Sequence, residues 1–152
     1  MSSSNRSPFA ARAPDYEQRV RDGFVGQAFM DLLGARLERV EPGLVEISVH
    51  RRDNLLQQHG FFHGGVVATL ADNAGGFAAF SLMSRNEQPL SVEFKVNLLA
   101  PGVGESLFAR GQVVRDGRVL KVCRSDVYAL TDGTQKHCAT ALVTVIARDT
   151  LD

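Results

Sequence analysis

Residues 63–85 read HGGVVATLADNAGGFAAFSLMSR and contain the longest helix that the sequence predicts, Gly64–Ser84. One side of this helix is apolar at amphipathic spacing, with Val67, Leu70, Ala74, Phe77 and Ala78. The other side has one charge, Asp72, among Gly65, Ala68, Thr69, Asn73, Gly75, Gly76, Ala79 and Phe80. Two adjacent glycines weaken a helix by about 1 kcal/mol each relative to alanine. We therefore expect this side to pack on another backbone, most simply the same helix of a second copy across a two-fold axis.

Asp72 is the only formally charged residue between His63 and Arg85. An ionised carboxylate on a small, apolar face is unfavourable without a partner, and such groups are candidates for functional sites. The spacing from His63 to Asp72 places the two side chains on roughly opposite sides of the helix, about 13 Å apart along its axis. One chain cannot bring both to a common substrate, whereas two antiparallel helices can. The spacing therefore predicts a site shared at a dimer interface.

The rest of the chain predicts two short helices and six strands. The first helix is expected from Asp15 to about Phe24, where Asp15 and Gln18 match a capping box, and the second over Gln27–Leu33, ending at Gly34. Strands are expected at residues 35–40, 44–50, 91–98, 105–114, 118–130 and 135–147, separated in part by Asp-Gly turns. One long helix among six strands indicates an α+β fold, with a curved antiparallel sheet wrapped on the helix.

The composition is that of one globular domain. Residues 1–14 contain Ser and Arg but no acidic residue, which predicts a disordered N-terminal tail before a domain at residues 15–152. The 17 basic and 17 acidic residues cancel, so neither nucleic acid nor a membrane is an expected partner, and the cytoplasm is the expected location. We expect Cys123 and Cys138 to be reduced and buried. No His, Cys and Asp cluster has metal-ligand spacing, so no metal or cofactor is expected.

The segment before the long helix is rich in groups that can bind an oxygen. Gly64 and Gly65 follow His63 at the helix start, where backbone N–H groups are unsatisfied and the helix dipole is positive. A backbone N–H in this position can polarise a thioester carbonyl. Phosphate-binding loops use the same feature, so this segment alone does not decide the function.

Two segments together resemble the hotdog-fold thioesterases, in particular the phenylacetate-pathway and thioesterase-superfamily group. They are His-Gly-Gly-x-x-x-x-Leu-x-Asp-Asn at residues 63–73 and Ser-Val-Glu-Phe-Lys-Val-Asn-x-x-x-Pro-Gly at residues 91–102. The resemblance implies a long helix wrapped by a bent sheet, and homodimers, or tetramers of two dimers, with active sites at the dimer interface. It also implies hydrolysis of acyl-CoA thioesters to the free acid and CoA.

The resemblance assigns roles to three residues of the first segment. Asp72 matches the family's catalytic carboxylate, either as general base on water or as nucleophile that forms a mixed anhydride. Gly64 matches the glycine whose N–H polarises the thioester carbonyl. His63 is expected to orient the loop or to assist near the sulfur.

The resemblance also assigns roles to four further residues. Gln57 is expected to bind the carbonyl or the attacking water, and Ser91 to place water near the carboxylate. Gly65 and Asn73 are expected to contact the substrate. In this family Gln at the 57 position often accompanies Glu rather than Asp at the 72 position, so the chemical path stays open.

Two other functions are compatible with the same fold. A hydroxyacyl-thioester dehydratase shares the carboxylate and histidine, but its histidine precedes a Phe-Pro-Gly segment instead of Gly-Gly. A non-catalytic acyl-CoA sensor has little use for a buried charge beside a thioester. Arg115, Arg118 and Lys121 flank a predicted turn and are candidates for binding the CoA phosphates. The acyl group is not defined by the sequence.

Overall fold

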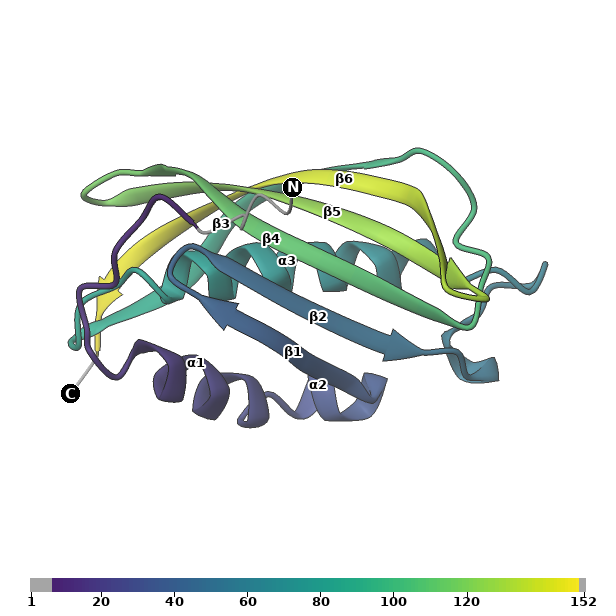
Figure 1. The fold of residues 1–152 in the computed structure, drawn as a ribbon, viewed down its shortest axis with the longest axis horizontal. Helices are drawn as coiled ribbons and strands as arrows, with labels where there is room; N and C mark the ends of the chain where they lie inside the picture. Colours follow the sequence, from purple (N-terminus) through teal and green to yellow (C-terminus); the bar gives the residue numbers. More distant parts are fainter. Residues whose placement is uncertain (1–6, 151–152) are drawn as a thin grey trace, which may run out of the picture.

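The computed structural model describes residues 7–150. The elements are α1 (Tyr16–Val25), α2 (Ala28–Leu33), β1 (Ala35–Glu41), β2 (Leu44–His50), a 3-10 turn η1 (Asp53–Leu55), α3 (Gly64–Phe80), β3 (Glu87–Leu98), β4 (Ser106–Asp116), β5 (Leu120–Thr131) and β6 (Thr134–Asp149). The six strands form one antiparallel sheet in the order β1-β2-β4-β5-β6-β3. Figure 1 shows the curved sheet lying over α3, with α1 and α2 beside β1. The predicted α+β hotdog fold is confirmed.

The inward side of α3 forms the centre of the core. The five apolar residues of the predicted stripe, from Val67 to Ala78, are all buried. The sheet approaches the helix backbone directly at Gly111 of β4. A Cβ at this position would lie 2.2 Å from the carbonyl oxygen of Ala74. The close approach therefore depends on a residue without a side chain.

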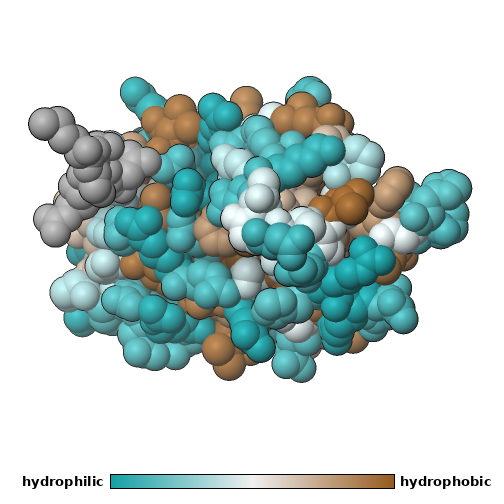
Figure 2. Space-filling model, turned by 45° about the vertical axis from the view of Figure 1, so that its right-hand side comes forward, coloured by the Kyte–Doolittle hydropathy of each residue, from teal (hydrophilic) through white to brown (hydrophobic). Residues whose placement is uncertain are grey.

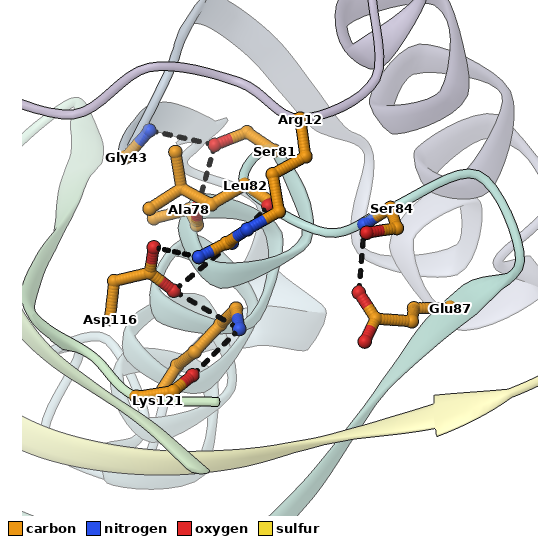
Figure 3. Close-up of polar contacts among 10 residues, drawn as sticks. Arg12, Gly43, Ala78, Ser81, Leu82, Ser84, Glu87, Asp116 and Lys121 are labelled. Carbon is orange, nitrogen blue, oxygen red and sulfur yellow. Dashed lines mark hydrogen bonds and ion pairs between the residues drawn. The ribbon is translucent and has the colours of Figure 1, made fainter. Parts of the chain in front are cut away.

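The long helix ends earlier than predicted, at Phe80 instead of Ser84. The Ser81 hydroxyl donates to the carbonyl of Ala78 (2.6 Å) and accepts from the Gly43 N–H (2.8 Å; Figure 3). Beyond it, Arg12 donates to the Leu82 carbonyl at 2.6 Å, as Figure 3 also shows. These side chains satisfy the last carbonyls, so the backbone can leave the helix without losing hydrogen bonds.

The predicted capping box at the start of α1 is wrong. The Asp15 side chain makes no capping hydrogen bond and lies 3.5 Å from Arg85 instead. Gln18 donates to Asp22 at 2.7 Å, one turn further along the helix. The reason is the backbone of Asp15, with φ −95° and ψ 19°, which lacks the extended conformation that an N-cap needs to reach the third residue.

Residues 7–14 lie against the domain rather than apart from it. Ala13 is fully buried, Phe9 packs against the core, and Arg12 forms an ion pair with Asp116 at 2.7 Å. The disorder predicted for residues 1–14 therefore does not describe this part. Residues 1–6, the rest of that predicted tail, lie outside the described residues.

Lys121 lies beside the ion pair of Arg12 and Asp116 (Figure 3). Its side chain is 1% exposed, and its Nζ lies 3.1 Å from Asp116 Oδ1. Burial raises the pKa of Asp116, but the hydrogen bonds and charges of Arg12 and Lys121 outweigh it and lower that pKa below its ordinary value. The expectation that Lys121 binds CoA phosphates is thus wrong, because its ammonium group is buried and paired.

Strand β3 forms one edge of the sheet and is unusually exposed. Its alternating apolar residues Val92, Phe94 and Leu98 are each about half exposed, at 53%, 45% and 59%. The strand begins at Glu87, earlier than expected, and includes Pro89. An edge strand tolerates proline because one side of its backbone has no strand partner. On the face drawn in Figure 2, hydrophobic side chains form separate patches on a largely hydrophilic surface.

The two cysteines are buried and form no disulfide, as predicted. Burial raises the pKa of the Cys123 thiol to about 12, which keeps it protonated and unreactive. Within residues 7–150, no helix has the length and apolar character needed to cross a membrane.

Candidate active site

Asp72 lies in a pocket between α3 and β3, which we call the carboxylate pocket. Its lining consists of Gln27, Asp72, Asn73, Gly76, Phe77, Pro89, Leu90 and Ser91, and its volume is about 290 Å³. Helix α3 contributes the carboxylate, β3 contributes Ser91, and the junction of α1 and α2 contributes Gln27. Three predicted site residues, Asp72, Asn73 and Ser91, are therefore brought together here.

The Asp72 carboxylate is partly buried and has one hydrogen bond within residues 7–150. Ser91 Oγ donates to its Oδ1 at 2.8 Å, which leaves Oδ2 available to a substrate or a water molecule. Burial raises the pKa of Asp72, and the Ser91 hydrogen bond only partly offsets this. A carboxylate with a raised pKa holds a proton more readily, which suits a group that must accept one from water.

Asn73, the neighbour of Asp72, has a polar atom without a partner. Its Oδ1 is buried and accepts no hydrogen bond from any described residue. An unsatisfied buried acceptor of this kind destabilises a protein by about 1–3 kcal/mol. A donor from a substrate, a water molecule or a second subunit would remove that penalty.

The start of α3 borders a second hollow, which we call the helix-start pocket. It is lined by Gln57, Phe61, Phe62, Gly64, Val67, Leu98, Leu99, Ala100, Pro101 and Gly102, and its volume is about 390 Å³. It thus contains two more predicted site residues, Gln57 and Gly64, with His63 and Gly65 adjacent in the chain.

His63 determines which backbone donors remain available at the helix start. It is the N-cap residue, and its Nδ1 accepts from the Gly65 N–H at 2.9 Å. Since Nδ1 is an acceptor, the neutral ring has its proton on Nε2. The Gly65 N–H is therefore occupied, whereas the Gly64 N–H donates to no acceptor among residues 7–150. The structure leaves Gly64, the residue assigned by the resemblance, as the available donor.

Gln57 is similarly restricted to one role. It begins a turn in which the Gly60 N–H donates to the Gln57 carbonyl at 2.9 Å, and Gly60 has a φ of +80°. The Gln57 Oε1 accepts from the backbone N–H of His59, so the Nε2 group is the part that can donate to a ligand.

The two sets of residues line different pockets of the same chain. Asp72 does not line the helix-start pocket, and neither Gln57 nor Gly64 lines the carboxylate pocket. His63 itself lines neither pocket, and the expectation that it meets Asp72 only across two subunits stays a prediction. Sequence reasoning missed Gln27, Pro89 and Leu90 as pocket residues. Gln27 lies in a short junction between two helices and belongs to no recognisable motif.

Within residues 7–150, no group of three or more His, Cys, Asp or Glu side chains is placed to hold a metal ion.

Comparison with known proteins places this chain in a family. The sequence pattern of the thioesterase superfamily matches residues 59–136. This range includes all of α3 and β3 and every predicted site residue except Gln57, which lies just upstream. The chain belongs to the thioesterase superfamily.

Individual relatives agree with this assignment. A thioesterase family protein from Silicibacter pomeroyi is 46% identical, with a TM-score of 0.87 over 88% of this chain and 98% of its own. The PaaI protein of the E. coli phenylacetic acid degradation operon shares the fold, with 20% identity and a TM-score of 0.79 over 91% and 96% of the chains. A 1,4-dihydroxy-2-naphthoyl-CoA hydrolase from Listeria monocytogenes is 23% identical over 78% of this chain and 94% of its own.

Proposed function

We propose that this protein hydrolyses acyl-CoA thioesters to the free acid and CoA, in sites shared between two subunits. The main observation behind this proposal is the Asp72 carboxylate, which lies in a pocket, accepts a hydrogen bond from Ser91 and has a pKa raised by burial. The superfamily assignment supports thioester hydrolysis in general, and the relative that acts on a naphthoyl-CoA supports a CoA ester as the substrate.

The dimer supplies what one chain lacks. In an antiparallel pair of α3 helices, the helix-start pocket of one subunit faces the carboxylate pocket of the other. The exposed apolar edge strand β3 supports such pairing, since joining two copies there extends the sheet and covers Val92, Phe94 and Leu98. Two such dimers can associate further as a tetramer.

In this arrangement each residue has a defined task. The Gly64 N–H and the Gln57 Nε2 donate to the thioester oxygen and stabilise the negative charge that develops there. Asp72 Oδ2 takes a proton from water as the water oxygen attacks the carbonyl carbon, and Ser91 holds Oδ1. The tetrahedral intermediate then expels the CoA thiolate, which receives the proton, and the acid is released. A raised pKa makes the Asp72 carboxylate both a stronger base and a stronger nucleophile, so the mixed-anhydride path stays an alternative.

Replacing Asp72 by Asn tests the catalytic assignment. Asp72→Asn preserves the shape and removes the base, so thiol release from an acyl-CoA should fall by at least about 100-fold. The Kd for the substrate should change little. Near-normal turnover in this variant would contradict the role of Asp72 and favour a non-catalytic acyl-CoA binder.

Mixing two variants tests the shared site. Asp72→Asn and Gln57→Ala each damage every site of their own homodimer. A purified heterodimer, made by co-expression with two different affinity tags, contains one site with both native residues and one without either. It should recover about half of the wild-type activity per dimer. If activity stays at the level of the two homodimers, or if the wild-type protein sediments as a monomer, the shared site is refuted.

A further inference from the structure

The carboxylate pocket has open space above one residue of α3, Gly76. Among residues 7–150, a Cβ built on Gly76 would have one neighbour within 4 Å, Ser91 Oγ at 3.9 Å. A Cβ on the preceding residue, Gly75, would instead lie 3.0 Å from both Ser125 Oγ and Val143 Cγ2. Gly76 is four residues after Asp72, so both lie on the same side of the helix, one turn apart. The space above Gly76 is therefore directly beside the catalytic carboxylate.

The walls around this space are mostly apolar and come from separate elements. Phe77 forms one wall, and its ring is fixed against Phe24 with a centroid distance of 5.8 Å. Pro89 and Leu90 of β3 form another. The remaining wall is Gln27, which lies outside the residues that match the superfamily pattern.

Gln27 is half-buried, and its backbone, not its side chain, holds the start of α2. Its carbonyl accepts from the N–H groups of Met30 (3.0 Å) and Asp31 (3.3 Å) and so begins α2. Its side chain makes no capping hydrogen bond. The size of the residue at position 27 can therefore change without removing a hydrogen bond that caps the helix.

We propose that Gly76 sets the width of the acyl group that the site accepts, and that Gln27 limits its length. This inference rests on the proposed function and names the substrate class: acyl groups with a branch or a ring next to the thioester carbonyl. Space for such bulk must lie beside the reacting carbon, and Gly76 provides it one helical turn from Asp72. A side chain at position 76 would fill this space first.

The chemistry of the pockets favours the acyl group over the CoA arm in this space. CoA has phosphate groups, and no Lys or Arg lines the carboxylate pocket in the described part of the chain. Arg51 does not line the helix-start pocket, but its Nη2 lies 3.8 Å from where a Gly60 Cβ would be, in the turn that begins at Gln57 of that pocket. A guanidinium at that side suits phosphate, so the CoA arm leaves past the helix start and the uncharged acyl group lies over Gly76.

A panel of acyl-CoAs tests the inference through ratios within each variant. The panel pairs straight-chain groups (acetyl, butanoyl, octanoyl) with wide ones (2-methylpropanoyl, benzoyl, phenylacetyl). Gly76→Ala and Gly76→Val should lower the wide-to-straight ratio of kcat/KM by about 10–200-fold, the larger side chain having the larger effect. Gln27→Ala should raise the octanoyl-to-butanoyl ratio instead. Gln112→Ala, on the face of β4 that is turned away from α3 and in neither pocket, serves as control and should leave both ratios unchanged.

The ratios show whether the acyl group or something else occupies the space above Gly76. A loss that is equal for all substrates in Gly76→Ala would overturn the inference, because the CoA arm or a second subunit would then lie there. Unchanged ratios would overturn it as well. A wild-type protein that releases thiol from no member would contradict the proposed function. In that case the Kd of each acyl-CoA, measured for the wild type and for Gly76→Ala, would test the inference through the wide-to-straight ratio of Kd values.

Discussion

The inward and outward sides of α3 both include small residues, yet these residues meet different surroundings. On the inward side, a Cβ on Gly75 would meet Ser125 and Val143 of the chain's own sheet, and a Cβ on Gly111 of the sheet would meet the Ala74 backbone. On the outward side, Gly76 faces open space, beside the carboxylate of Asp72. Small residues on the first side allow the helix and the sheet to pack closely. On the second side they leave room for something that the single chain does not contain.

This difference shows that adjacent glycines in one helix can have different roles. Gly75 and Gly76 are adjacent, and both weaken the helix by about 1 kcal/mol relative to alanine. For Gly75, close packing against β5 and β6 compensates for that loss. For Gly76 the described residues provide no compensation, which is expected where a residue serves binding rather than folding. The two sides can therefore be distinguished by mutation.

The largest loss of stability is expected from a substitution at Gly111, where the sheet touches the inward side of α3. In Gly111→Ala the new Cβ would lie 2.2 Å from the carbonyl carbon and oxygen of Ala74 and 2.6 Å from the Gly75 nitrogen. These are backbone atoms, so α3 itself must move away from β4. We expect the free energy of unfolding to fall by more than about 3 kcal/mol in urea denaturation. Gln112→Ala, whose side chain points to the other face of β4, should change it by less than about 0.5 kcal/mol.

The next comparison uses the adjacent glycines themselves. Gly75→Ala places a Cβ 3.0 Å from Ser125 Oγ and 3.1 Å from the Val143 Cβ, which cannot rotate away, so we expect a loss of about 1–3 kcal/mol. Gly76→Ala adds a Cβ in open space and gains up to about 1 kcal/mol of helix propensity. Thermal unfolding should thus show Tm shifts of opposite sign. Shifts of the same sign would mean that the two sides of α3 are not as different as described.

The sequence predicts one side of α3 better than the other. The apolar stripe from Val67 to Ala78 follows from its spacing and is buried. Gly75, Ala79 and Phe80 are expected on the outward side, but all three are buried within the chain. Consecutive helix positions differ by only 100°, and α1, which packs on this end of α3, widens the buried side. No spacing rule indicates how far such a covering helix reaches.

The site is predictable to the extent that it lies in motifs. Asp72 and Ser91 belong to two separate segments of the sequence, and the structure joins them by a hydrogen bond of 2.8 Å. Gln27 escapes prediction because it reaches the pocket through the packing of α1 and α2, which leaves no pattern in the sequence. The alternation in β3 correctly predicts a strand, but Val92 and Phe94 are exposed, since one chain alone does not cover that edge.

The smallest effect is expected in the pH dependence of stability, and it concerns the one charge on the outward side. Burial raises the pKa of Asp72 in the folded chain above its ordinary value of 3.8. A carboxyl group with a raised folded-state pKa destabilises the fold when it is ionised, at pH values above that pKa. As the pH falls through the folded-state pKa toward the ordinary value, the folded protein takes up the proton first and the destabilisation disappears. Asp72→Asn should therefore be more stable than wild type at neutral pH, and the difference should vanish on acidification.

The difference in the free energy of unfolding between Asp72→Asn and wild type should stay below about 1 kcal/mol, because the carboxylate remains partly in contact with water. Urea denaturation at a series of pH values measures it, and Asp53→Asn, at an exposed carboxylate outside both pockets, is the control. In the dimer that we propose, association of two subunits would add two opposed effects at Asp72: further burial, which raises its pKa, and the positive helix start of the partner, which lowers it. We expect burial to prevail. A wild-type protein that is more stable than Asp72→Asn at neutral pH would show that the partner's helix start dominates, so the sign of this small difference reports which surroundings the outward side has in the assembled protein.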